Sequence, residues 1–277
     1  AALMMLNLLE HSPIGSYGHN SAEALHALIE AKKLAYADMA KHVCDPAFHD
    51  VPATALASKS YAMNRVRAID PARANPEVAP GVLPTTGGDT TYLSVVDRHG
   101  NMVSLIQSIF ANFGSGLVPE GAGFVLQSRG GLFTLDPLHP NALAPGKRPL
   151  HTIIPGFMKN GDVRVAFGIM GGWNQSQAHA QFISNVIDHG MNIQAALEAA
   201  RMTKLTFTGC DVTMESRVPE WVRLELMDKG HEIDLRGPFS SMVGGGQSVM
   251  RDYAAGVNSG ASDPRKDGAA IPELFPS

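Results

Sequence analysis

The spacing of apolar residues predicts helices in the first quarter of the chain. Asn20, followed three residues later by Glu23, predicts the N-terminal cap of the first of them. A second helix is expected over residues 58–69, because Pro71 cannot continue it. The run over residues 1–9 is too short to span a bilayer and indicates the end of a buried helix. The apolar positions at helical spacing in the first helix are Leu25, Leu28, Ile29, Tyr36 and Met39.

Beyond residue 90 the pattern shifts to alternation, which predicts strands. Residues 91–96 and 102–109 are β-prone and flank a turn over residues 97–101. Asn192 is a good N-cap for one of two later amphipathic helices. This order indicates an α/β chain with mostly antiparallel strands. The remaining expected elements are a hairpin of residues 153–158 and 163–167, helices over 175–187 and 192–201, and a final hairpin of 247–250 and 254–258.

A segment rich in proline and glycine separates these two parts. Residues 70–89 contain four prolines and a glycine pair, which favour an extended and exposed linker. We therefore divide the chain into residues 1–89, helical with a linker, and residues 90–277, mixed sheet and helix.

Composition narrows the class of protein. The 277 residues are 44% hydrophobic and 17% charged, which fits a globular domain. With 22 basic against 26 acidic residues the net charge is −4, so we expect no nucleic-acid partner. Cys44 and Cys210 form no CxxC pair and predict neither a disulfide framework nor a metal cluster.

Most familiar catalytic motifs are missing from the chain. It has no GxSxG, GxxxxGK[ST] or HExxH sequence. The glycine clusters at residues 114–116 and 244–246 lack a phosphate-loop context and are expected in turns. The eleven histidines are scattered, and we do not expect the pair His42 and His49 to hold a metal.

Thr90 stands out because it follows the linker directly and precedes a strand directly. Taken alone, the Thr90-Thr91 pair at a strand start would reflect β propensity. Its surroundings indicate more, because five blocks of sequence together resemble the γ-glutamyltranspeptidase family of N-terminal nucleophile hydrolases. The blocks are Thr90 to Asp97 with Gly100-Asn101, Phe113-Gly114-Ser115-Gly116, Gly146-Lys147-Arg148-Pro149-Leu150, Gly171-Gly172, and Gly260-Ala261-Ser262-Asp263-Pro264-Arg265.

The resemblance implies a four-layer αββα sandwich, an α+β fold with mostly antiparallel sheets. Residues 1–89 resemble the C-terminal part of the family's large subunit, and residues 90–277 resemble a complete small subunit; the two would form one joint domain. Roughly the first half of a typical precursor has no counterpart in this chain. We therefore expect the missing large-subunit portion, or its separate chain, as a partner. In the transpeptidases that portion carries an arginine that grips the substrate α-carboxylate.

The resemblance also implies roles for particular residues. A cut between Asp89 and Thr90 would give Thr90 a free α-amine, whose reference pKa of about 7.7–8.0 suits a base near neutral pH. Thr90 would then be both nucleophile and base, since a threonine hydroxyl needs activation. Ser108 lies where the family places a hydroxyl that hydrogen-bonds the nucleophile, and Gly171 and Gly172 lie where backbone N–H groups form the oxyanion hole. A simple tight turn is the alternative for the glycines.

Departures from the family pattern concern the substrate. Leu132 replaces the aspartate that binds the α-ammonium group of a γ-glutamyl substrate, and a leucine cannot pair with an ammonium ion. His151 and Thr152 replace two serines, and Phe110 replaces an asparagine. Arg129 replaces a neutral glutamine and favours a substrate that carries a carboxylate. We expect Arg129, His151 and Thr152 to contact the substrate, while a surface salt bridge is the alternative for Arg129 and a structural ion pair the alternative for Arg148.

Together these features predict a self-processing amidohydrolase that cleaves before Thr90 and hydrolyses a small carboxylated amide, as in the oxamate amidohydrolase branch of the family. The alternatives are a γ-glutamyl hydrolase or transferase, a cephalosporin-type acylase, and an unprocessed homologue that serves as a binding or structural module. We expect no metal or organic cofactor, no nucleic-acid or membrane partner, and a small-molecule amide as substrate; an oligomer is compatible with the sequence. A cytoplasmic location is expected, with a periplasmic or secreted one as the alternative.

Overall fold

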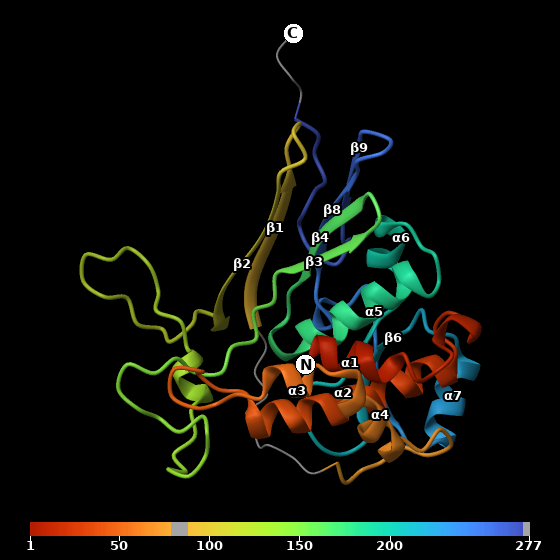
Figure 1. Ribbon diagram of the computed structural model, residues 1–277, viewed down its shortest axis with the longest axis horizontal. Helices are drawn as coiled ribbons and strands as arrows, with labels where there is room; N and C mark the ends of the chain where they lie inside the picture. Colours follow the sequence, from red (N-terminus) through yellow and green to blue (C-terminus); the bar gives the residue numbers. More distant parts are fainter. Residues whose placement is uncertain (79–87, 274–277) are drawn as a thin grey trace.

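The computed structural model describes residues 1–78 and 88–273, with the backbone alone for Gly88 and Asp89. Helices occupy its N-terminal part, as the apolar spacing predicts: α1 (Ala2–Leu9), α2 (Ala22–His42), α3 (Ala53–Leu56) and α4 (Lys59–Arg65). The long helix α2 is buried over most of its length, and it shares one hydrophobic core with α1 (Figure 1). None of the helices in the described ranges is both long and apolar enough to cross a bilayer.

Thr90 belongs to a hairpin of two antiparallel strands, β1 (Gly88–Val96) and β2 (Met102–Ala111). Successive side chains of a strand point to opposite faces. On the inner face Tyr92 and Ile106 are buried. The other face, which we call the apolar outer face, carries two directly opposed pairs that are 42–52% exposed: Leu93 with Leu105, and Val95 with Val103.

The inner face of this hairpin packs on a four-stranded antiparallel sheet. Its strands are β3 (Gly156–Asn160), β4 (Val163–Ile169), β8 (Gly246–Asp252) and β9 (Val257–Ser262), in the order β3-β4-β8-β9. Gly168 of β4 permits this close approach, because a Cβ there would lie 2.3 Å from the Tyr92 ring. Helices α5 (Gln175–Ile187) and α6 (Ile193–Glu198) cover the opposite face of the sheet and form a second core with it (Figure 1).

Helices α5 and α6, the four-stranded sheet and the β1–β2 hairpin thus form three successive layers in the αββα order. The predicted α+β fold with mostly antiparallel sheets is confirmed. The apolar outer face is the side on which a further layer would pack, and within the described residues its side chains stay exposed.

A third, smaller sheet was not predicted from the sequence. It contains β5 (Met202–Thr203), β6 (Asp211–Glu215) and β7 (Glu232–Arg236), and α7 (Glu220–Asp228) joins β6 to β7. These two strands are parallel, which requires a crossover such as this helix. Beside β6 lies a buried charge network in which Arg265 binds both Glu215 and Asp263, and Arg201 binds Asp263.

The predicted elements agree with the structure where caps and periodicity are local. Helix α5 has the predicted bounds, and Asn192 caps α6 by accepting the Ala195 N–H at 2.9 Å. The predicted cap at Asn20 is wrong by one residue. Asn20 takes a left-handed φ of 55° and donates to Ala200 O instead, so Ser21 caps α2.

Two further expectations concern segment boundaries. The last strand begins at Val257 rather than at residue 254, because the turn that includes Gly256, with φ of 70°, occupies the intervening residues. Residues 79–87 of the predicted linker lie outside the described residues.

Candidate active site

The hairpin register places Thr90 directly opposite Ser108. Directly paired residues point to the same face, so the two hydroxyl groups meet. The Thr90 hydroxyl donates to Ser108 Oγ at 3.0 Å, and Thr90 is only 7% exposed. The backbone of Asp89 pairs with Phe110, while its side chain lies outside the described residues.

A β-bulge interrupts the hairpin at this point. Asp89 pairs with Phe110 and Thr90 with Ser108, so Ile109 is an extra residue on β2. Phe110 has a φ of 74°, which is rare for a bulky side chain and marks a strained position. The bend turns the Phe110 N–H back to Ser108 Oγ, at 3.0 Å. The bulge therefore helps to fix the hydroxyl that contacts Thr90.

Arg129 supplies a second donor to the same oxygen. It begins a short 3₁₀ helix (Arg129–Leu132), is 1% exposed, and donates from Nη2 to Ser108 Oγ at 2.8 Å. Its Nη1 donates to Thr152 Oγ1 at 2.8 Å, and its guanidinium lies 5.0 Å from the centre of the Phe110 ring. We call Thr90, Ser108, Arg129 and Thr152 the nucleophile row.

The charge of Arg129 is unusual for a buried position. Buried charges are normally paired, but Arg129 makes no ion pair with any residue whose side chain the structure describes. Burial lowers the pKa of Arg129 to about 10, so the guanidinium remains protonated at neutral pH. The alternative of a surface salt bridge for Arg129 therefore does not hold among the described residues, because Arg129 is buried.

Gly171 and Gly172 form a turn between β4 and α5 that only glycine adopts easily. Their φ angles are 126° and 59°, and a 3₁₀ turn (Gly172–Asn174) leads into the helix. Strand β1 contacts this turn. Backbone N–H groups at the start of a helix are suited to bind a developing negative charge. The turn is thus close to the nucleophile row and has the chemistry expected of an oxyanion hole.

Three contacts from distant parts of the chain hold this glycine turn. The Ile169 N–H donates to His179 Nε2 at 3.1 Å, and the Met170 N–H donates to Gly245 O at 3.0 Å. Asn174 Nδ2 donates to Val243 O at 2.8 Å. The glycine cluster at residues 244–246, expected only to form a turn, therefore also supports the candidate oxyanion hole.

A cavity of about 160 Å³ opens beside the glycine turn. Thr152 lines this cavity and is the member of the nucleophile row that connects the cavity to Arg129. His151 also lines the cavity; it is exposed, and its Nδ1 is hydrogen-bonded to Pro149 O. The walls of the cavity are mainly apolar, and they include Met39, Val43, Leu150, Ile154 and Trp173. The structure thus brings His151 and Thr152 to one chamber next to Gly172, with Arg129 behind Thr152.

Two other positions singled out from the sequence, Leu132 and Arg148, make structural contacts outside the cavity lining. Leu132 is 1% exposed and packs in the larger core, so it offers the cavity no polar group. Arg148 binds the Asp45 carboxylate through its backbone N–H and side chain, with Nη2 to Oδ1 at 2.8 Å. These hydrogen bonds hold the pKa of Asp45 well below its usual range. The structural ion pair proposed for Arg148 is therefore present.

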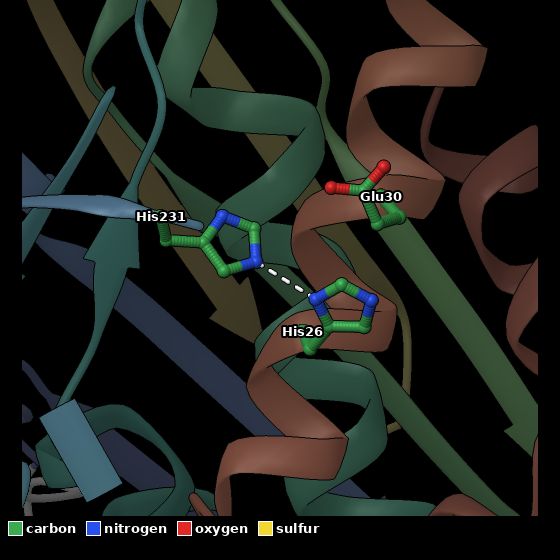
Figure 2. Close-up of side chains that lie close together, drawn as sticks. All are labelled: His26, Glu30 and His231. Carbon is green, nitrogen blue, oxygen red and sulfur yellow. Dashed lines mark hydrogen bonds between the residues drawn. The ribbon is translucent and has the colours of Figure 1, made fainter. Parts of the chain in front are cut away.

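A second cluster of potential ligands lies in the helical half, away from these residues. His26, Glu30 and His231 are all buried, and their ligand atoms lie within 4.8 Å of one another (Figure 2). His26 Nδ1 and His231 Nε2 already share a hydrogen bond of 2.8 Å, and Lys33 binds the Glu30 carboxylate at 2.7 Å. Since Lys33 already pairs with the Glu30 carboxylate, we interpret the cluster as a contact that joins α2 to the residue before β7.

The pKa values of the two histidines of this cluster are both lowered. Burial, followed by the charges of His26, Lys33 and other lysines, lowers the pKa of His231 to about 3. His26 also has a lowered pKa, mainly because of burial. Lowered pKa values favour the uncharged rings in this interior, where His231 Nδ1 has no hydrogen-bond partner among the described residues.

Several site residues were not found from the sequence. Phe110 was noted only as a departure from a family pattern, whereas its backbone and ring both contact the nucleophile row. His179 and Asn174 support the glycine turn from within and beside α5. Positive φ and side chain-to-backbone contacts leave no periodic signal in a sequence, so a single chain offers no means of finding them.

Comparison with known proteins gives a consistent result over the chain. The family model for gamma-glutamyltranspeptidase matches residues 1–273. The glutathione hydrolase-like YwrD proenzyme of Bacillus subtilis is 34% identical over 97% of this chain and 51% of its own length. The oxamate amidohydrolase proenzyme of Klebsiella pneumoniae is 36% identical over 91% of this chain and 47% of its own length. The chain thus spans about half the length of these curated relatives.

Solved structures agree with this. The cephalosporin acylase from Bacillus halodurans has a TM-score of 0.85 and 39% identity, over 99% of this chain and 50% of its own. A gamma-glutamyltranspeptidase from Pseudomonas nitroreducens complexed with L-DON has a TM-score of 0.59 and 27% identity. That match covers 66% of this chain and all of the shorter one.

Proposed function

This chain belongs to the γ-glutamyltranspeptidase family, and from that premise we propose that it is part of a self-processing amidohydrolase with Thr90 as the nucleophile. The observation that carries the proposal is the contact between the Thr90 hydroxyl and Ser108 Oγ at the start of β1, beside the glycine turn. The relatives named proenzymes support a maturation step. The shorter transpeptidase chain covers a share of this chain similar to that of residues 90–277.

The proposed chemistry starts with self-cleavage. Thr90 Oγ attacks the carbonyl carbon of Asp89, the peptide C–N bond breaks, and the hydroxyl proton ends on the Thr90 nitrogen. Water then hydrolyses the resulting ester, which restores the hydroxyl and leaves a carboxylate on Asp89. The freed amine is a base close to its own hydroxyl, so the mature residue can attack a substrate amide. The N–H groups of the glycine turn would stabilise the oxyanion that forms.

For the substrate, we propose a small amide that carries a carboxylate, such as oxamate. Arg129 places a positive charge, which no described side chain pairs, behind Thr152 of the cavity lining. A carboxylate in the cavity would contact Thr152 and His151, and the positive charge of Arg129 would attract it. The buried Leu132 itself offers no partner for an α-ammonium group. A relative named oxamate amidohydrolase supports this class of substrate.

One observation favours a second candidate, an acylase that accepts a longer acyl group. The cavity is lined mostly by apolar side chains, including Met39, Val43 and Leu150, which would suit a short carbon chain. The solved structure of a cephalosporin acylase matches 99% of this chain. A γ-glutamyl hydrolase has support from relatives named glutathione hydrolase, although Leu132 does not favour an α-ammonium substrate.

We further propose that a portion outside this chain completes the protein. The curated relatives are about twice as long, and the apolar outer face of the hairpin lacks a covering layer among the described residues. The partner would be that portion, either as part of one precursor or as a separate chain.

The first test is N-terminal sequencing and intact mass of the purified complete protein, beside its Thr90→Ala variant. We expect a fragment that begins Thr90-Thr91-Tyr92 in the wild type and an uncut chain in the variant. Hydrolysis of oxamate and of a γ-glutamyl anilide would then be compared in competition. An uncut wild-type chain would contradict the proposal and would favour the alternative of an unprocessed homologue that serves as a binding or structural module.

A further inference from the structure

Arg129 has contacts that no substrate is needed to explain. Two of its N–H groups bind Ser108 Oγ and Thr152 Oγ1, and its guanidinium lies against the Phe110 ring. With 1% of its surface exposed, it sits behind the cavity wall and outside the cavity lining. A residue whose only task is to grip a carboxylate would present its free N–H groups to the ligand.

Ser108 Oγ is the point on which these contacts converge. It accepts the Phe110 N–H at 3.0 Å and Arg129 Nη2 at 2.8 Å, in addition to the Thr90 hydroxyl at 3.0 Å. Two fixed N–H donors determine where this oxygen sits, and the oxygen in turn determines where the Thr90 hydroxyl points. Only one hydroxyl group therefore separates the charge of Arg129 from the nucleophile.

We propose that Arg129 is a positioning residue that holds the Thr90 hydroxyl in place through Ser108, during self-cleavage as well as during turnover. The inference rests on the proposed function of Thr90. It differs from the role of Arg129 toward substrate because self-cleavage involves no substrate carboxylate.

The chemistry of self-cleavage gives this role its physical basis. As Thr90 Oγ forms its bond to the Asp89 carbonyl carbon, its proton leaves toward the nitrogen of the breaking C–N bond. Negative charge develops on the oxygens of the reacting centre in this step, and a fixed nearby cation stabilises it more than water would. Among the side chains that the structure describes, none adds a charge effect to the pKa of Arg129, which burial lowers. Its charge is thus not neutralised by a neighbour within that part of the chain.

The test is the rate of self-cleavage of the complete protein, made by cell-free translation without substrate. Arg129→Met removes the charge and the donors, Arg129→Lys keeps the charge, and Arg164→Met is the matched control. Like Arg129, Arg164 makes two side-chain hydrogen bonds and lies near an aromatic ring, that of Tyr253. Its acceptors are the backbone carbonyls of Gly161 and Val163, and it lies in β4, outside the nucleophile row. Melting of each precursor is compared in a Thr90→Ala background, which separates folding from cleavage.

We expect Arg129→Met to slow self-cleavage by about ten- to hundredfold, comparable to the loss of one oxyanion donor or somewhat less. Arg129→Lys should recover part of that rate, and Arg164→Met should cleave like the wild type. A folded Arg129→Met precursor that cleaves at the wild-type rate would overturn the inference, even if it later binds carboxylated amides poorly.

A second variant keeps the test decisive if Arg129→Met does not fold. Thr152→Val removes one anchor of the guanidinium and keeps its charge, so we expect self-cleavage to slow several-fold. Wild-type rates in both Thr152→Val and Arg129→Lys would overturn the inference. A wild-type protein that never cleaves would instead contradict the proposed function, so the two failures are distinguishable.

Discussion

Phe110 combines strain and contact in a single residue. Its left-handed backbone, costing on the order of 1–3 kcal/mol, turns its N–H to Ser108, and its ring lies against Arg129. A strained backbone conformation persists only where the surrounding structure fixes it. Here the bulge opposite Thr90 and the burial of the Phe110 ring, which is 4% exposed, fix the conformation of Phe110.

At the same scale, Gly171 should not tolerate a side chain. Its φ of 126° disfavours any other residue, and a Cβ would lie 3.1 Å from the side chain of Asn174. We expect Gly171→Ala to lower kcat of the mature enzyme at least tenfold, because the N–H groups of the glycine turn would shift. Gly161→Ala is the control, since that glycine also has positive φ but no atom near its missing Cβ. Equal kcat values for both variants would argue against an oxyanion role.

At the scale of elements, helix α5 supports the end of β4 through a buried histidine. His179 is 2% exposed, and its neutral Nε2 accepts the Ile169 N–H. Burial lowers the pKa of His179 from 6.5 to about 4. The unfolded chain therefore takes up a proton at a higher pH than the folded one does. The resulting stability is fully present above pH 6.5 and is lost as the pH falls to about 4.

We expect this contact to show in the pH dependence of melting. The loss amounts to about 3 kcal/mol for one fully buried group. His179→Gln should therefore show a smaller fall in Tm between pH 6.5 and 4 than the wild type does, measured in the Thr90→Ala background. Identical slopes would mean that other groups, such as His26 and His231, account for the whole effect.

The contrast between local and distant contacts explains what could be predicted from the sequence. The bounds of α5 and the cap at Asn192 depend on residues within one helical turn, and the predictions were right. The cap at Asn20 failed because its side chain binds Ala200, far along the chain. In the site, Thr90 and Ser108 followed from the family resemblance and lie together, but the roles of Phe110 and residues 244–246 depend on folded geometry.

At the scale of the whole molecule, one buried charge network joins the end of the chain to β6 and α6. Arg265 donates to both oxygens of Glu215 at 2.6 Å and to Asp263 at 3.0 Å, with its side chain fully buried. Arg265→Met should cost about 3–5 kcal/mol, since two buried carboxylates would lose a partner. Arg217→Met, which removes a partly exposed partner of Glu215, should cost about 1 kcal/mol or less.

Chemical denaturation of the purified variants checks this prediction. Equal losses for Arg265→Met and Arg217→Met would show that burial of the network does not set its contribution to stability.

The apolar outer face makes a prediction about assembly. If the part of the protein outside this chain covers it, a charge placed there should weaken the association. In the complete protein, we expect Val103→Lys to reduce the fraction of the fragment beginning at Thr90 that copurifies with the fragment ending at Asp89. The same change should increase binding of an apolar dye. Val257→Lys is the control, since Val257 is as exposed but lies on β9. Unchanged copurification in Val103→Lys would contradict a covering layer at this face.

The glycine turn has a consequence for the timing of synthesis. It depends on Gly245 and on Val243, which a ribosome adds about 70 residues after Gly172. At about 5–20 residues per second, Thr90 and Ser108 leave the ribosome many seconds before the turn beside them can be held. If this site performs the self-cleavage, we expect the cut only after Gly245 has been synthesised, so that the two fragments are already folded together when they form.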